Sequence, residues 1–141
     1  MLYFYISIID ISSIGIKKEL VINNSSQPSD YLPLTEASFL ILLSLAPGKK
    51  HGYAILKDVE AMSSGKISLS TSTLYTALGR LFDQGLIERV DNLEGGESTG
   101  GPGLPRKAYC LSSVGRRVLE AETQRLSELL STARLRLQPQ E

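Results

Sequence analysis

Residues 70–90 read STSTLYTALGRLFDQGLIERV, and this stretch decides the fold because a helix and a strand follow each other within it. Leu74, Leu78, Leu81 and Phe82 recur every three or four residues, which is the spacing of a helix with one buried face. The last residues, LIERV, have the alternating, β-branched pattern of a strand. The stretch therefore predicts a helix that packs on a core and leads directly into a β-strand.

The second face of this helix carries side chains of a different kind. Ser72, Tyr75, Thr76, Gly79 and Arg80 lie off the apolar stripe, and they are not the mixture of Glu and Lys that keeps a surface helix soluble. In an arbitrary globular domain a face rich in hydroxyl groups is most often only solvated. The neighbouring segments must therefore show whether this face has a function.

The ends of this helix have clear signals. Ser70 is a good N-cap residue, because its hydroxyl can accept a hydrogen bond from an exposed amide of the first turn. Gly85 is the residue type that best adopts the left-handed conformation after a helix. We therefore expect a helix over residues 71–84.

Two further helices are predicted upstream. Thr35 can cap a helix through the apolar segment EASFLILLSLA, which a Pro-Gly pair ends. The segment HGYAILKDVEAMSSG predicts an amphipathic helix with Tyr53, Leu56 and Val59 on its buried stripe and Ile55 beside them. KISL after it could be a short strand. His51 is the only histidine, so we expect it to cap or pack rather than to bind a ligand.

Downstream, a second strand completes a hairpin. The loop DNLEGGESTGGPGLP has five glycines and two prolines in fifteen residues, and RKAYCL follows it as a strand. Three helices followed by a β-hairpin are the layout of a winged helix-turn-helix, in which the third helix lies in the DNA major groove. The sequence thus predicts a mainly α fold with a small β-hairpin (α+β).

The last helix is expected from Ser112, as its cap, to about residue 137. One seam of this helix repeats every four and three residues, as in a coiled coil. The first three helices have enough apolar residues to cover one another, so we expect a second copy of the chain to cover the seam. The predicted dimer-interface residues are Leu119, Thr123, Leu126, Leu130, Ala133 and Leu137.

Composition narrows the class of protein. The chain has 141 residues, which favours one domain, and its 15 Lys and Arg balance its 15 Asp and Glu. Residues 49–117 nevertheless hold ten Lys and Arg against seven Asp and Glu, a small local excess of positive charge. Cys110 is the only cysteine, so an internal disulfide is impossible, and we expect a buried apolar thiol.

The segments before the first helix predict no role in the fold. MLYFYISIIDISSIGI lacks the charged start and cleavage site of a targeting signal, and it is shorter than the roughly 20 apolar residues of a membrane span. INNSSQPSD has the composition of a linker. We therefore expect a cytoplasmic protein without membrane contact. Its predicted parts are an extension and linker (1–33), a winged-helix domain (34–111) and a dimerisation helix (112–138).

No pattern in the sequence predicts catalysis. The carboxylates are scattered over separate outward faces, and the glycine loop lacks the Lys and the following helix that a phosphate-binding loop needs. We found no nucleophile motif and no cluster of metal ligands in the sequence. The predictions are no enzyme, no cofactor and no metal.

Three segments resemble the PadR-like family of transcriptional regulators. HGYAILKDVE looks like the second helix of that family, LSTSTLYTALGRLFDQGLI like its recognition helix, and PRKAYCLSSVGRRVLEAE like its second wing strand and the start of its last helix. The resemblance covers residues 34–137 in the same order, and one helix after the wing is typical of the short form. Ser72 departs from the pattern, since the family commonly has Gly just before TLY.

The resemblance implies that Tyr75 and Ser72 are the main contacts to DNA. Small hydroxyl side chains can approach base edges and phosphates closely, and Arg80 can neutralise a phosphate or reach a guanine. Basic residues at helix ends and beside the wing can meet the flanking backbone. The candidate DNA-binding residues are Ser70, Thr71, Ser72, Thr73, Tyr75, Thr76, Arg80, Lys49, Lys66, Arg106 and Lys107.

Together these observations predict a homodimeric, sequence-specific regulator of transcription that acts as a repressor. Its helix 71–84 would lie in the major groove and its wing 86–111 on the backbone of a two-fold-related operator in double-stranded DNA. The resemblance implies a small-molecule effector or partner signal near the dimer interface, of unknown identity. The alternatives are a winged-helix module that binds proteins and not DNA, a winged-helix regulator of the MarR type, and a small enzyme.

Overall fold

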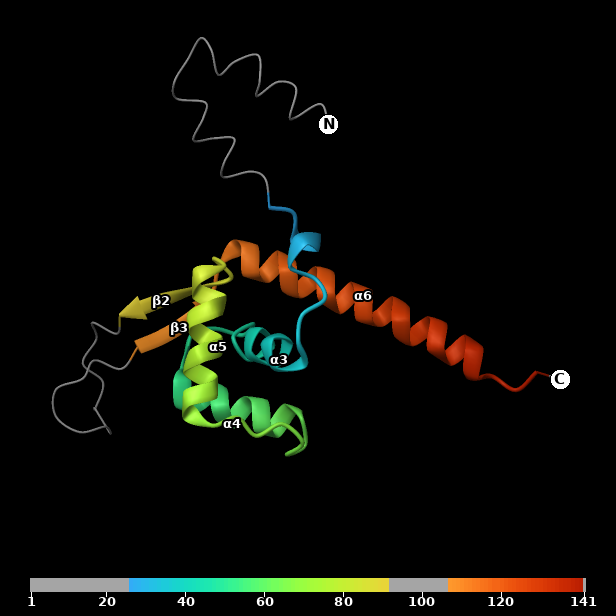
Figure 1. Ribbon diagram of the computed structural model, residues 1–141, viewed down its shortest axis with the longest axis horizontal. Helices are drawn as coiled ribbons and strands as arrows, with labels where there is room; N and C mark the ends of the chain where they lie inside the picture. Colours follow the sequence, from blue (N-terminus) through green and yellow to red (C-terminus); the bar gives the residue numbers. More distant parts are fainter. Residues whose placement is uncertain (1–25, 92–106, 141) are drawn as a thin grey trace, which may run out of the picture.

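The computed structural model describes residues 26–91 and 107–140. Its helices surround an apolar core, a small sheet lies on one side, and the last helix extends away from the other (Figure 1). The predicted mainly α fold with a small antiparallel sheet is confirmed. In chain order the elements are η1 (Pro28–Tyr31), α3 (Glu36–Ser44), β1 (Lys50–His51), α4 (Gly52–Met62), α5 (Thr71–Asp83), β2 (Ile87–Asp91), β3 (Lys107–Leu111) and α6 (Ser113–Leu137).

Side-chain caps fix where three helices begin, as the sequence predicted. The hydroxyl of Thr35 accepts a hydrogen bond from the amide of Ser38, and Ser70 and Ser112 cap α5 and α6 in the same way. Each such cap contributes about 1 kcal/mol to stability. Gly85 follows α5 with a φ of 74°, which a residue with a side chain rarely adopts.

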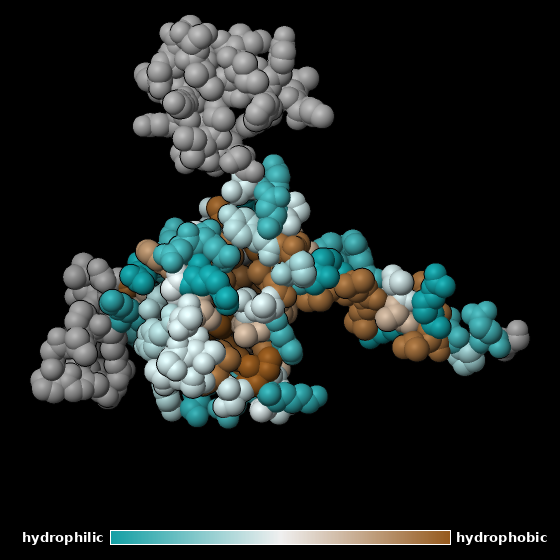
Figure 2. Space-filling model, viewed as in Figure 1, coloured by the Kyte–Doolittle hydropathy of each residue, from teal (hydrophilic) through white to brown (hydrophobic). Residues whose placement is uncertain are grey.

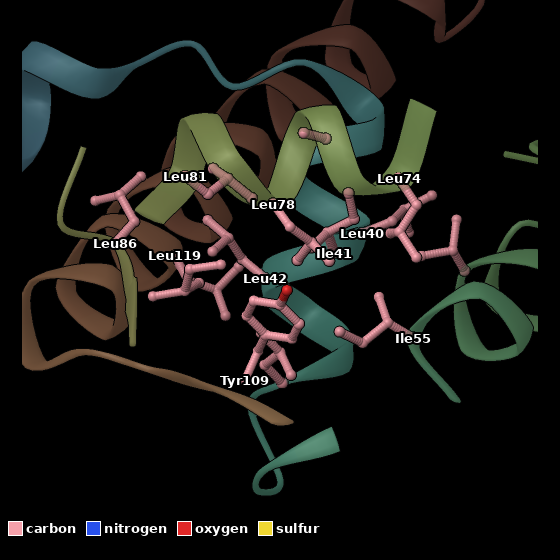
Figure 3. Close-up of a cluster of buried hydrophobic side chains, with 14 of the residues drawn as sticks. Leu40, Ile41, Leu42, Ile55, Leu74, Leu78, Leu81, Leu86, Tyr109 and Leu119 are labelled. Atoms are coloured by element: carbon pink, nitrogen blue, oxygen red, sulfur yellow. The ribbon is translucent and has the colours of Figure 1, made fainter. Parts of the chain in front are cut away.

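The apolar face of α5 packs on α3, which runs through the middle of the core (Figure 3). Most sides of α3 are buried, as its nearly continuous apolar sequence predicted, and Phe39 and Leu43 on the remaining side are partly buried. α4, β3 and α6 add side chains around these two helices. The labelled core residues in Figure 3 are Leu40, Ile41, Leu42, Ile55, Leu74, Leu78, Leu81, Leu86, Tyr109 and Leu119.

The sheet has three antiparallel strands in the order β1-β3-β2, and not only the two strands of the predicted hairpin. β2 and β3 pair from Ile87 with Leu111 to Asp91 with Lys107. β1 has two residues, which pair with Tyr109 and Ala108 of β3. The short strand expected at KISL is wrong, since residues 66–69 form neither helix nor strand.

The predicted buried stripe of α4 is wrong at Tyr53 and right at Val59, while Leu56 is partly buried against the core. Tyr53 is 71% exposed, whereas Gly52, Ile55 and Val59 are buried. Because Gly52 and Ile55 are buried in place of Tyr53, while Val59 stays buried, the inner face of α4 is rotated by less than the roughly 100° that separates neighbouring residues. This rotation places the start of α4 against α5.

The segment before α3 belongs partly to the fold, which corrects the predicted linker over 22–30 and the exclusion of residues up to 33. η1 lies against α6 (Figure 1), and Tyr31, Leu32 and Leu34 pack against the core. The side chain of Glu122 on α6 is 1% exposed and accepts a hydrogen bond from the Leu34 amide. The described part of the fold therefore begins near residue 28.

α6 has two halves with different surroundings. Gly115, Val118, Leu119 and Glu122 are buried against the chain itself, while residues from Leu126 onward are exposed. Leu119 was predicted in the dimer seam, but it is 5% exposed and lies in the core of its own domain. Within the described residues, no helix combines the length and the apolar character that crossing a membrane requires.

Candidate functional site

The outward face of α5 is the candidate site. Leu74, Ala77, Leu78 and Leu81 are buried on one side of the helix, so the opposite side faces solvent. The exposed residues include the predicted contacts on α5, which the helix brings together over its first three turns. They are Thr71, Ser72, Thr73, Tyr75, Thr76 and Arg80.

Hydrogen bonds order the hydroxyl groups at the start of α5. The Ser70 hydroxyl accepts from the Thr73 amide at 3.1 Å and donates to the Thr73 hydroxyl at 2.8 Å. The Ser70 and Ser72 hydroxyl oxygens lie 3.2 Å apart, and Thr76 donates to the Ser72 carbonyl at 2.9 Å. The cap thus uses the Ser70 and Thr73 side chains, whereas the oxygens of Ser72 and Thr76 can still accept hydrogen bonds from outside.

Tyr75 lies at the edge of this face, beside the start of α4. Its side chain is half-exposed, and its hydroxyl is 2.8 Å from the place where a Cβ on Gly52 would be. The phenol ring therefore rests directly on the backbone of the first residue of α4. The sequence did not predict this contact, because Gly52 and Tyr75 lie on different helices and nothing in the local pattern links them.

Positive side chains flank α5 on two sides. Lys49 precedes β1, Lys107 begins β3 and Lys66 lies in the connection between α4 and α5, and all three are exposed. Lys50 instead forms an ion pair with Asp58. Arg106, the remaining predicted contact, lies outside the described residues.

One further cation beside α5 was not predicted. The Arg89 guanidinium on β2 stacks on the ring of Phe82, 4.3 Å from its centre. Phe82, assigned to the buried face by its spacing, is 38% exposed and lies at the edge of that face, where Arg89 covers part of its ring. Arg89 is positioned at the end of α5 far from the hydroxyl groups of its first turn.

Side chains that can ligate a metal are scattered over the described residues. No group of three His, Cys, Asp or Glu that could hold a metal occurs among them. Cys110 is half-buried rather than fully buried as expected, and its sulfur lies 4.0 Å from a Glu88 carboxylate oxygen. Burial and the Glu88 charge raise the pKa of this thiol, so the reactive thiolate is disfavoured.

The far half of α6 exposes an apolar stripe. Leu126, Leu130 and Leu137 of the predicted seam are 38%, 51% and 82% exposed. Figure 2 shows hydrophobic side chains along this arm between hydrophilic ones. Leu129, which the heptad spacing omitted, is 53% exposed and lies one turn before Ala133. The Thr123 hydroxyl donates a hydrogen bond to the Leu119 carbonyl at 2.8 Å. Because its proton is used within the helix, Thr123 adds little polarity to the stripe.

Comparisons with known proteins agree on one family. A family model described as the transcriptional regulator PadR-like family matches residues 41–121, more than half of the 141 residues. A PadR family transcription regulator from Clostridium difficile is 27% identical, with a TM-score of 0.60 over 74% of this chain and 100% of that chain. A PadR-like transcriptional regulator from Bacillus cereus is 22% identical, with a TM-score of 0.58 over 73% of this chain and 92% of that chain, and shows the shared fold.

Among curated proteins, the chain is similar to an uncharacterised 37.1 kDa protein in transposon TN4556 of Streptomyces fradiae. The two are 33% identical over 94 residues, which are 67% of this chain and 24% of that protein. The chain thus spans about a quarter of the length of this relative.

Proposed function

The chain belongs to the PadR-like family of transcriptional regulators, and from this premise we propose that it binds an operator as a homodimer and represses transcription. In this proposal α5 enters the major groove and the β2–β3 wing meets the neighbouring backbone. The family consists of regulators rather than enzymes, and membership of it decides against a regulator of the MarR type.

The exposed face of α5 is the observation that carries the proposal. Ser72 and Thr76 offer small hydroxyl groups near the start of the helix, where such side chains reach base edges. Tyr75 can donate its hydroxyl to a phosphate, and Arg80 lies exposed one turn after Thr76. Ser72, Thr76 and Arg80 are exposed to solvent, and Tyr75 is half-exposed beside them with α4 against one side of its ring.

The flanking lysines support binding to the backbone. Lys66 lies in the connection before α5, Lys49 directly precedes β1, and Lys107 begins β3, which pairs with β1. Each lysine that meets a phosphate releases a counterion, so affinity should fall steeply as salt rises. With an overall net charge of zero, binding depends on these local positions and on two copies acting together.

The apolar stripe on α6 supports the homodimer. Leu126, Leu129 and Leu130 stand on an arm beyond the domain, where water would otherwise meet them. When two copies pack together through this stripe, the stripe of each copy is buried by the other, as in two-fold symmetric interfaces. The dimer then holds two α5 helices for two half-sites about one turn of DNA apart.

Repression and its release follow from the same arrangement. A dimer on an operator blocks access to that DNA, and a change in the angle between the two domains separates the α5 helices from their half-sites. A small-molecule effector that binds the DNA-incompetent arrangement more tightly would release the operator.

Selection from random duplex DNA tests the proposed function. The wild-type chain is incubated with a pool of random duplexes at low salt, and the bound fraction is sequenced over several rounds. The proposal predicts a recovered site with two-fold symmetry whose half-sites lie about ten base pairs apart. Recovery of no enriched sequence would favour the alternative, a winged-helix module that binds proteins and not DNA.

A further inference from the structure

We infer that Gly52 is a positioning residue for DNA binding, because only a glycine there lets the Tyr75 phenol lie against the start of α4. This inference rests on the proposed function and deepens it. It adds a residue on α4 that touches no DNA itself and determines where a side chain of α5 can meet the backbone.

The space around Gly52 is filled by Tyr75. A Cβ on Gly52 would lie 2.8 Å from the Tyr75 hydroxyl oxygen, 3.2 Å from Cζ and 3.6 Å from Cε1. A real Cβ atom is essentially never found within 3.0 Å of another heavy atom. All three contacts involve the hydroxyl end of the ring. Any other residue at position 52 would place its Cβ in the space that this end of the ring occupies.

The first residue of α4 and the edge of α5 thus meet through this single ring. Gly52 is buried, while Tyr75 remains half-exposed. Contact on one side reduces the positions that the ring can adopt, and solvent on the other side leaves its hydroxyl able to donate to a phosphate. A side chain that is already ordered loses less entropy on binding, which favours the complex.

An added methyl group at position 52 should move the ring and leave the fold intact. The hydroxyl is the far end of a flexible side chain, so the clash is relieved by rotation of Tyr75 rather than by a shift of the backbone. Gly52 has no φ in the left-handed region, and alanine favours a helix more than glycine does. Gly52→Ala therefore tests the position of Tyr75 without a large loss of stability.

The experiment measures binding of the duplex recovered by the wild-type chain to Gly52→Ala, Tyr75→Ala and the double variant. Gly48→Ala is the control, because nothing lies within 4 Å of a Cβ at Gly48. We expect Gly52→Ala to raise Kd about three- to tenfold, the size of one lost hydrogen bond. The double variant should bind no more weakly than Tyr75→Ala, and melting temperatures should show that all variants are folded.

Three results would overturn the inference in distinguishable ways. If Gly52→Ala binds like the wild type while Tyr75→Ala is weakened, Gly52 does not position Tyr75 and the proposed function stands. If Gly52→Ala weakens binding equally with and without Tyr75, the glycine acts through its own backbone. If Tyr75→Ala binds like the wild type, the Tyr75 contact of the proposed function is wrong as well.

Discussion

Single residues on α6 connect this helix to the end of α5. The Ser112 hydroxyl donates to the Gly85 carbonyl at 2.6 Å, and the Ser112 amide donates to the Leu86 carbonyl at 3.1 Å. Three residues later, Gly115 approaches so closely that a Cβ there would lie 1.9 Å from the Leu86 carbonyl oxygen. The first turn of α6 and the turn after α5 therefore move as one unit.

Gly115→Ala should be strongly destabilising. The atom that the new methyl group meets is backbone, which cannot rotate away, so α6 must shift. Such overpacking costs typically 1–3 kcal/mol. Thermal unfolding followed by circular dichroism measures the effect. Gly79→Ala is the matched control, since nothing lies within 4 Å of its Cβ and alanine should stabilise α5 slightly. An equal melting temperature for Gly115→Ala and the wild type would contradict the close approach.

Glu122 makes the stability of the protein sensitive to acid. The hydrogen bond from Arg125 lowers the pKa of the Glu122 carboxyl, and the Arg125 charge and the Leu34 amide lower it further, while burial opposes them. A carboxyl with a lowered pKa stabilises the fold above its unfolded pKa of about 4.3, and this contribution is lost as pH falls through the folded value.

Glu122→Gln should therefore lower the melting temperature at pH 7 by several degrees, from a loss of about 1–3 kcal/mol. The difference from the wild type should shrink toward pH 3, because Glu122 is increasingly protonated as pH falls through its lowered folded pKa. Melting curves at the two pH values measure this. Glu120→Gln, at an exposed position of the same helix, should change neither value. A difference that is as large at pH 3 as at pH 7 would exclude a role for the Glu122 charge.

Among the elements, those specified by local sequence were predictable. Ser70, Gly85 and Ser112 gave the ends of α5 and α6 because caps and left-handed turns depend on residues within one turn of the chain. The outward face of α5 was predictable for the same reason, since the spacing of its leucines fixes the opposite side.

Elements that depend on distant partners could not be predicted. β1 has two residues, and it is a strand only because β3 lies beside it. Gly52 has no side chain to mark the buried face of α4, so the exposed Tyr53 was taken for a core residue. η1 is ordered against α6 through Leu34 and Glu122, which are far apart in the sequence.

The lysines on the elements around α5 should determine how binding responds to salt. Lys66→Gln and Lys107→Gln should each reduce the slope of log Kd against log salt by about 0.9, because each removes one phosphate contact. Titration of the recovered duplex at several salt concentrations measures the slope. Arg134→Gln, at the far end of α6, is the control and should leave it unchanged. Unchanged slopes in both lysine variants would remove these lysines from the interface.

At the level of the whole molecule, the exposed second half of α6 is the surface that the proposed dimer uses. The stripe that is buried by the domain at Gly115, Val118 and Glu122 continues along the same side of the helix to Leu126 and Leu129. One side of α6 thus packs on the domain over its first half and, in the proposed dimer, contacts a second subunit over its second half. A change in how two copies pack would be passed to both α5 helices.

Leu126→Asp should dissociate the dimer, because it places an unpaired charge in the interface. The dimer dissociation constant should rise about a hundredfold or more, which sedimentation velocity measures over a range of concentrations. Leu135→Asp is the matched control, since Leu135 is 66% exposed and lies about 180° around α6 from Leu126. If Leu126→Asp sediments as the wild type does, this stripe is not the dimer interface.

The most direct test of the central claim maps the DNA onto α5. Amide resonances of the isotope-labelled wild-type chain are followed while the recovered duplex is added. The account predicts the largest shifts at residues 71–80 on the exposed side of α5, with smaller shifts at Lys66 and Lys107 and none beyond Leu130. Tight binding of the duplex that leaves the amides of Ser72, Tyr75 and Thr76 unshifted would contradict it.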